Sequence, residues 1–183
     1  DFELEVSTCA LIPRQETEFL IDFALKKVSD MNSGRWADLG TGSGPLAVSL
    51  AKALPSWNGH ASDISKDALD LAERNLKTIA PNSNVSFSLG DWWEPLEKWW
   101  GCFDLVLSNP PYIPSKLIKE LEPVVKNHEP LIALDGGEDG MNASRKIILG
   151  ALNGLAKGGW LILEHHYDQS DEITSVMKNI GME

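Results

Sequence analysis

The corner Asn109-Pro110-Pro111-Tyr112 has the residue types that most directly suggest chemistry. Both prolines lack an N–H donor and stiffen the turn, which leaves the Pro110 carbonyl and the Asn109 side-chain oxygen as paired acceptors. Two such acceptors suit a planar NH₂ group, and we expect Tyr112 to stack on that group and exclude water. The alternative is a proline-rich strand terminator with a satisfied Asn109.

The corner would act mainly by orientation. An amide or exocyclic amine nitrogen has a delocalised lone pair, so it must be held against a strong electrophile such as a sulfonium methyl. Each acceptor bond contributes only about 0.5–1.5 kcal/mol, whereas aligning two reactants can lower a barrier by roughly 7–11 kcal/mol. The sequence shows no general base, and none is needed if the proton leaves to water after transfer.

A glycine loop, Gly40-Thr41-Gly42-Ser43-Gly44, stands where a strand is expected to lead into a helix. Glycine permits positive φ and close approach of backbone to a ligand, and the free N–H groups of the helix favour negative charge. Pro45 occupies the place of the third glycine of a dinucleotide motif, which disfavours pyrophosphate binding. The loop therefore predicts a different adenosine cofactor, the alternative being a tight turn that binds nothing.

Two further acids follow the next predicted strands. Asp63 lies 63 − 40 = 23 residues after Gly40, close to the spacing of about 20 expected for an acid that accepts ribose hydroxyls. Its alternative role is that of an acid at a helix N-terminus. After the third strand, Asp91 could accept from an exocyclic amine, and Trp92 offers an apolar wall for a purine. We expect most of the neighbouring tryptophans to be packing residues.

Alternating strands and helices must position these residues. Apolar periodicity predicts strands at Trp36–Leu39, Gly59–Ile64, Val85–Leu89, Phe103–Ser108 and Trp160–Glu164, with helices over 16–30, 46–54, 66–79, 140–157 and 171–179. This order predicts an α/β fold with a doubly wound, mostly parallel, Rossmann-like sheet that binds ligands at the carboxyl ends of its strands. A long polar segment separates Tyr112 from the helix beginning near residue 140.

The N-terminal residues 1–15 are predicted to form a β-hairpin leading into a single catalytic domain over 16–183. Phe2 to Val6 alternates apolar and charged residues, and a second short apolar run follows. The chain has 183 residues, the size of one domain. Because a fifth strand and one helix leave a flank of the sheet unpaired, we expect a fragment that lacks C-terminal strands.

Composition restricts the partners. Lys+Arg 16 against Asp+Glu 27 gives a net charge of −11, which repels nucleic-acid phosphates and remains compatible with a basic protein partner. No apolar run is long enough for a membrane span, and the acidic start lacks a secretory signal. Two cysteines are too few for a disulfide framework or zinc cage, so we expect a soluble intracellular chain with reduced thiols and no membrane partner.

Taken together, these residues resemble the class I S-adenosylmethionine-dependent methyltransferases. Within that class, Leu11-Ile12-Pro13-Arg14-Gln15-Glu16-Thr17-Glu18 is similar to the I-P-R-P-E-T-E signature of the HemK or PrmC family, the release-factor glutamine N5-methyltransferases. The similarity continues in order through the glycine loop, Gly90-Asp91-Trp92, Asn109 to Ile113 and Glu129 to Gly140, and spans nearly the whole chain.

The resemblance implies methylation of the side-chain amide of the glutamine in the Gly-Gly-Gln loop of peptide chain release factors. It implies that Gly40 to Gly44, Asp63, Trp92 and Asn109 contact S-adenosylmethionine, and that Asn109 to Tyr112 hold the glutamine. Arg14, Glu16 and Thr17 would line the approach. The Asn-Pro-Pro-Tyr motif is shared with methyltransferases acting on adenine or guanine amines, so an RNA or DNA amino-methyltransferase stays an alternative, as does a non-catalytic cofactor-binding remnant.

The chain departs from the family pattern in three ways. Gln15 replaces a proline, and Glu164-His165-His166-Tyr167-Asp168-Gln169 stands where the family usually has E-I-G-x-x-Q. The family's N-terminal helical domain and last strands are absent from the sequence. We expect no metal site at His165 and His166, because adjacent residues on a strand point to opposite faces.

Overall fold

A parallel five-stranded sheet forms the centre of the computed structural model, which describes residues 2–14 and 16–182. Within these residues the order of the strands is β3-β2-β1-β4-β5, which confirms the predicted doubly wound sheet. The register pairs Trp36 with Leu105, so the first and fourth strands are neighbours as expected. The strands are β1 Arg35–Leu39, β2 Asn58–Asp63, β3 Asn84–Leu89, β4 Phe103–Ser108 and β5 Leu155–Leu163.

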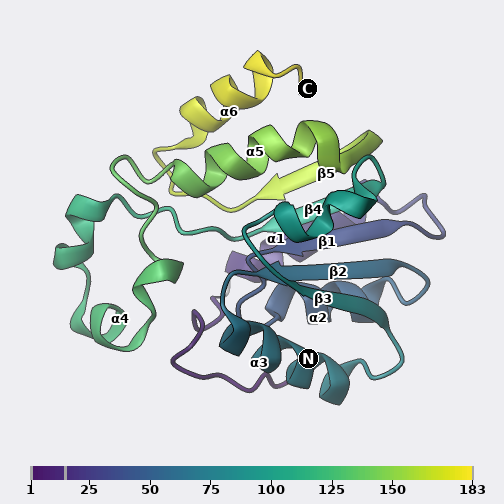
Figure 1. Ribbon diagram of the computed structural model, residues 1–183, viewed down its shortest axis with the longest axis horizontal. Helices are drawn as coiled ribbons and strands as arrows, with labels where there is room; N and C mark the ends of the chain where they lie inside the picture. The colour runs from purple at the N-terminus through teal and green to yellow at the C-terminus, as the bar shows by residue number, and fades with distance from the viewer. Residues whose placement is uncertain (1, 15, 183) are drawn as a thin grey trace.

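Helices cover both faces of this sheet (Figure 1). The α-helices are α1 Glu16–Lys27, α2 Pro45–Ala53, α3 Lys66–Ile79, α4 Pro123–His128, α5 Asn142–Gly154 and α6 Ser170–Asn179; the 3-10 helices are η1 Glu94–Trp99, η2 Ser115–Glu120 and η3 Leu131–Ala133. The alternating side chains of β1 explain the layers. Trp36 packs into a core with α1 and α2, whereas Ala37 and Leu39 face a second core shared with η1 and α5.

The predicted N-terminal β-hairpin is wrong. Residues 2–14 contain no strand, and their one tight turn lies at residues 8–10. The Glu5 N–H donates to Asn75 Oδ1 at 2.8 Å, and Asn75 Nδ2 donates back to the Glu5 carbonyl at 3.0 Å. A buried side-chain amide on α3 thus satisfies the backbone that a partner strand would have satisfied, and the alternation reflects only that Leu4 packs inward.

The boundary between α5 and β5 also differs from prediction, because the helix ends at Gly154 and the strand begins at Leu155. A Cβ on Gly154 would lie 2.1 Å from the Trp93 ring, so only glycine fits against this indole at the last residue of the helix. The strand then pairs Leu155 with Phe103 and passes an irregularity in the ladder before regular pairing resumes at Trp160. The periodicity had identified only the regular part.

The long polar segment after Tyr112 folds into short helices that stand to one side of the sheet (Figure 1). Its two ends meet: Ile113 forms an isolated parallel bridge with Asp135, and the Ser115 N–H donates to the Gly137 carbonyl at 2.8 Å. The excursion through α4 therefore closes on itself directly after the Asn-Pro-Pro-Tyr corner, which fixes residues 130–140 beside that corner.

A polar network around the buried His60 lies toward the amino ends of the strands. Arg35 Nη1 approaches His60 Nε2 at 2.8 Å, and Ser86 Oγ lies 2.7 Å from His60 Nδ1. Because guanidinium can only donate, Nε2 is the acceptor and Nδ1 carries the proton that Ser86 receives. The ring also lies 3.9 Å from the Trp99 ring. Burial, followed by the charges of Arg35 and Lys98, lowers the pKa of His60 to about 4.

This network predicts a pH-dependent stability. Between about pH 6.5 and 4 the unfolded chain binds a proton at His60 that the folded chain does not, so stability is full above the unfolded pKa and falls as the pH drops. A lowering from 6.5 to about 4 corresponds to about 3 kcal/mol. We expect the free energy of unfolding of the wild type relative to His60→Gln to fall by about that amount between pH 7 and pH 4 in urea titrations. A difference that stays constant with pH would contradict the buried neutral imidazole.

Candidate functional site

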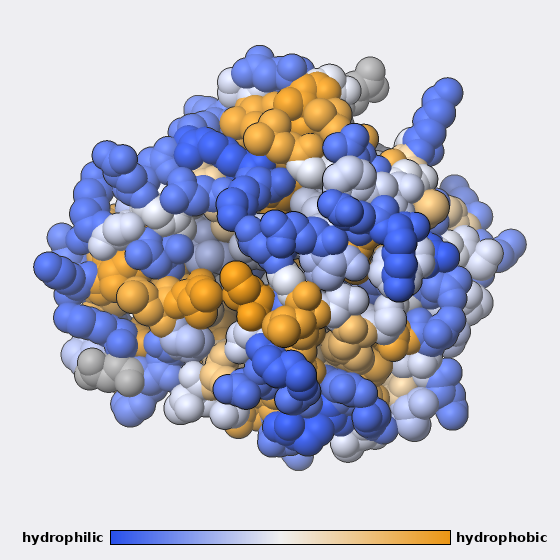
Figure 2. All heavy atoms as spheres, in the orientation of Figure 1, coloured by the Kyte–Doolittle hydropathy of each residue, from blue (hydrophilic) through white to orange (hydrophobic). Residues whose placement is uncertain are grey.

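A cavity of about 270 Å³ opens at the carboxyl ends of the strands, where the sheet topology predicts a ligand site. It is lined by residues from seven stretches of the chain: Cys9, Ala10, Leu11, Gly40, Gly42, Asp63, Ile64, Ser65, Ala68, Gly90, Asp91, Trp92, Asn109, Pro111, Pro130, Ile132, Ala133, Asp135, Asn142, Ala143 and Lys146. Apolar side chains gather in a band from the segment carrying α4 toward the sheet (Figure 2). The cavity is mostly apolar with a few polar groups, the usual character of a small-molecule site.

The glycine loop reaches the cavity through Gly40 and Gly42. Gly40, Gly42 and Gly44 have φ of 74°, 57° and 90°, which a residue with a side chain adopts only under strain. A Cβ on Gly40 would lie 2.8 Å from the Trp92 ring, and one on Gly44 would lie 3.0 Å from Ala72, whereas Gly42 meets only Ala10, at 3.8 Å. Gly42 is thus the position where the absence of a side chain leaves room for a ligand.

Three predicted cofactor residues of the glycine loop are buried and are not among the residues that line the cavity. Thr41 is buried and donates from Oγ1 to Asp38 Oδ2 at 2.7 Å, while Ser43 is buried without a hydrogen-bond partner for Oγ among the described residues. Gly44 is the N-cap of α2. Asp38 Oδ2 also accepts from the Ala47 N–H at 3.1 Å, so this acid ties the loop to the helix. Burial raises the pKa of Asp38 to about 7.

Asp63 lies between the loop and α3. Its Oδ2 accepts from the Gly42 N–H at 2.8 Å and its Oδ1 from the Ser65 N–H at 2.9 Å. Burial raises the pKa of this carboxyl, and the backbone donors partly offset that effect. Ser65 itself caps α3 by accepting from the Ala68 N–H at 3.3 Å. Asp63 therefore fixes the loop and, because each carboxylate oxygen has a further lone pair, can still accept from a ligand hydroxyl.

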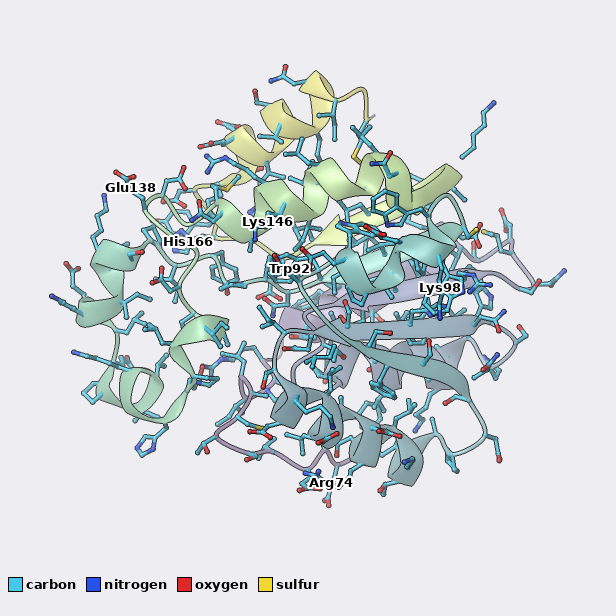
Figure 3. All side chains as sticks on the ribbon, viewed as in Figure 1. Arg74, Trp92, Lys98, Glu138, Lys146 and His166 are labelled. Atoms are coloured by element: carbon cyan, nitrogen blue, oxygen red, sulfur yellow. The ribbon has the colours of Figure 1, made fainter. Side chains whose placement is uncertain are left out.

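Beyond β3, Asp91 and Trp92 form another wall of the cavity. Trp92 is the one non-glycine residue with positive φ in the described chain, at 46°, and its indole packs over Gly40. Lys146 Nζ lies 2.6 Å from Asp91 Oδ2, and Figure 3 shows Lys146 descending from α5 toward the region of Trp92. The sequence analysis missed Lys146. Its position in the first turns of a helix facing the carboxyl edge of the sheet was the available signal.

The Asn-Pro-Pro-Tyr corner has two sides. Asn109 and Pro111 line the first cavity, and Pro110 is buried. Tyr112 lines a second cavity of about 460 Å³, together with Arg14, Glu164, His165, His166 and Tyr167. Tyr112 Oη donates to Glu164 Oε1 at 3.2 Å. The structure therefore brings together most of the predicted residues, but it places the Tyr112 ring on the far side of the corner from the glycine loop.

The two adjacent histidines do not lie on a strand, because β5 ends at Leu163. His165 and His166 consequently line the same cavity, contrary to the prediction that they point to opposite faces. His165 Nδ1 lies 2.8 Å from the His166 carbonyl, and His166 Nδ1 lies 2.6 Å from Asp168 Oδ1. Among residues 2–14 and 16–182, no group of three His, Cys, Asp or Glu side chains is placed to hold a metal ion.

The motif at the N-terminus is only partly described. Arg14 Nη2 lies 2.5 Å from Glu129 Oε1, which joins the motif to the start of residues 129–140, and Thr17 is buried. Gln15 and the Glu16 side chain lie outside the described residues. Arg14 lines the second cavity, whereas Thr17 is mostly enclosed.

Comparison with known families identifies the domain. The pattern of the family described as "Methyltransferase small domain" matches residues 15–127, more than half of the chain. The chain belongs to the methyltransferase small domain family. Its glycine loop, Asp63 and the Asn109 corner all lie within the matched range. None of the helices in the described part of this methyltransferase domain has the length and apolarity to cross a membrane.

Curated relatives of this methyltransferase domain share one name, "Release factor glutamine methyltransferase". The protein from Prochlorococcus marinus is 62% identical over 183 residues, covering 99% of this chain and 62% of its own length. Those from Thermosynechococcus vestitus and Caulobacter vibrioides are 42% and 38% identical, covering 90% and 97% of this chain and 57% and 61% of their own lengths. The chain spans about 60% of the length of these relatives.

Solved structures match the fold at low identity. The hMettl16 catalytic domain, solved in complex with a 3′UTR hairpin, gives a TM-score of 0.74 at 15% identity, covering 97% of this chain and 66% of that one. A ribosomal protein L11 methylase from Lactobacillus delbrueckii subsp. bulgaricus gives 0.65 at 19% identity, covering 91% and 69%. These neighbours confirm a Rossmann-like methyltransferase fold.

Proposed function

We propose that this chain is the catalytic part of an S-adenosylmethionine-dependent enzyme that methylates the side-chain amide nitrogen of the glutamine in the Gly-Gly-Gln loop of a peptide chain release factor. The observation that supports this most strongly is the placement of Asn109 and Pro111 in the same cavity as Gly42 and Asp63. The shared name of the relatives supports the choice of acceptor. Release factors act on ribosomes, so the proposed reaction is intracellular and involves neither a membrane nor direct binding of nucleic acid.

The cavity fits the proposed cofactor. Gly42 leaves open space beside the loop, and Asp63 offers two carboxylate oxygens next to it, as a ribose requires. Trp92 supplies a flat apolar wall and Asp91 an acceptor for an exocyclic amine. When bound, S-adenosylmethionine supplies an electrophilic sulfonium methyl. The residues proposed to hold it are Gly40 to Gly44, Asp63, Asp91, Trp92 and Asn109. Within the loop, Thr41, Ser43 and Gly44 are buried and would act by fixing the backbone conformation.

The proposed acceptor is held by the corner. Asn109 Oδ1 and the Pro110 carbonyl accept the two N–H bonds of the glutamine amide, which turns the nitrogen lone pair toward the cofactor side of the cavity. The cofactor would supply the methyl group for the new nitrogen–carbon bond, and water would take up the amide proton. Pro110 and Pro111 would keep the two acceptors fixed, so the rate enhancement would come mainly from orienting the amide nitrogen. Tyr112 limits access of water from the second cavity.

Transfer of labelled methyl to a release factor tests this proposal directly. We expect label on the glutamine of the Gly-Gly-Gln loop, located by mass spectrometry, and none on a Gln→Ala release factor. Equal label on both acceptors would overturn the assignment to that glutamine. Label on RNA or DNA but not on protein would instead support an amino-methyltransferase acting on nucleic acid, which the net charge of −11 disfavours. Binding of S-adenosylmethionine without any labelled acceptor would support a non-catalytic domain.

A further inference from the structure

The second cavity lies against the far side of Tyr112, and the function proposed above assigns it no ligand. We propose that it receives a basic side chain, lysine or arginine, of the acceptor protein close to the methylated glutamine. This inference rests on the proposed function, because it assumes a protein acceptor held at Asn109. It assigns a specificity subsite to Glu164, His166, Tyr167 and Asp168, within the segment that departs from the family pattern.

The charges around this cavity favour a cation. Arg14 is the permanently cationic side chain in its lining, and its guanidinium is paired with Glu129 at 2.5 Å. The Glu129 side chain is only 3% exposed, so this pair is anchored on the protein side. Glu164 lies on the wall, and the carboxylate of Asp168, which is outside the lining, lies 2.6 Å from Nδ1 of the lining residue His166. Two carboxylates beside one neutralised guanidinium give the cavity a negative field.

The aromatic rings favour the same kind of ligand. The His166 and Tyr167 rings lie 4.4 Å apart, and the Tyr112 and His166 rings lie 6.3 Å apart. Tyr167 is 85% exposed, so its face is available to an incoming group. Faces of aromatic rings attract ammonium and guanidinium groups, and the effect adds to that of the carboxylates.

The cavity is also held rigidly against the corner that positions the glutamine. Gln169 Nε2 donates to the Tyr112 carbonyl at 3.0 Å, and Gln169 Oε1 accepts from the His166 N–H at 3.0 Å. Tyr112 Oη donates to Glu164 on the other side. These bonds connect the loop after β5 to Tyr112 at several points, so a side chain seated in the cavity would help to register the acceptor at Asn109.

Steady-state kinetics with the full-length protein and a release factor test the inference. We expect Asp168→Lys to raise the KM for the acceptor about five- to tenfold with kcat and the KM for S-adenosylmethionine unchanged. Tyr167→Ser should raise the acceptor KM about two- to fivefold, whereas Tyr167→Phe, which keeps the ring, should not. Asp171→Lys is the matched control, because Asp171 is an exposed aspartate on α6, whereas Asp168 is hydrogen-bonded to the lining residue His166.

The acceptor provides the second arm of the test. Replacing each lysine and arginine near the glutamine of the release factor by alanine should identify one position whose loss raises KM in the wild type but not in Asp168→Lys. An acceptor KM that is the same in Asp168→Lys, Tyr167→Ser and the wild type would overturn the subsite while leaving the methyltransferase assignment intact. Absence of methylation of the release factor by the wild type would overturn the proposed function and this inference together.

Discussion

Asn109→Ala is expected to lower kcat by about 100-fold or more, because it removes one of the two acceptors that orient the amide nitrogen. Asn109 and Pro111 both line the cavity, and the change truncates only the Asn109 side chain. We expect the Kd for S-adenosylmethionine, measured by calorimetry, to change much less than kcat. Single-turnover methyl transfer with both reactants saturating measures the step directly.

The matched control for this change is Asn153→Ala. Asn153 is an exposed asparagine on α5 outside the cavity lining, so the same truncation there should leave kcat at the wild-type value. Unchanged turnover in Asn109→Ala would refute the role of the side chain as an acceptor, whatever the behaviour of the control.

Asp63→Ala is expected to raise the Kd for S-adenosylmethionine about 10- to 100-fold, because hydrogen bonds to a charged group contribute about 1.5–3 kcal/mol. The change also removes the acceptors for the Gly42 and Ser65 N–H groups, so the glycine loop loses an anchor. We expect kcat at saturating cofactor to fall less than the affinity does. Calorimetry gives the Kd, and thermal unfolding shows whether the fold is retained.

Asp67→Ala provides the comparison for Asp63. Asp67 lies four residues later, in the first turn of α3, and is exposed. Its replacement removes the same negative charge near the same end of α3, but Asp67 does not line the cavity. A loss of affinity in both variants would assign the effect to general electrostatics, and a Kd unchanged in Asp63→Ala would rule out its role in binding.

The order of the strands and the position of the cavity could be predicted from the sequence because each rests on a local signal. The runs that lead to Gly40, Asp63, Asp91 and Asn109 are strands of one sheet, and a doubly wound sheet brings their carboxyl ends together. The spacing of glycines and acids was therefore sufficient to place these residues around one cavity.

The errors arose where a distant contact decides the local structure. Phe2 to Val6 has the alternation of a strand, but its backbone pairs with the Asn75 side chain, about 70 residues away in sequence, which no local pattern reveals. The end of α5 depends in the same way on the packing of Gly154 against Trp93. The Tyr112 ring is likewise oriented by distant partners such as Glu164. Its position relative to the Asn-Pro-Pro-Tyr corner could therefore not be derived from the motif alone.

The hydrogen bonds of the buried His60 with Arg35 and Ser86 lie at the end of the strands opposite the cavity. The positive-φ backbone at Gly40, Gly42 and Trp92 lies at the other end. The polar network that is expected to affect stability and the candidate functional site therefore lie at opposite ends of the same sheet. We therefore expect that substitutions near the amino ends of the strands can raise the free energy of unfolding without changing the geometry of the proposed methyl-transfer site.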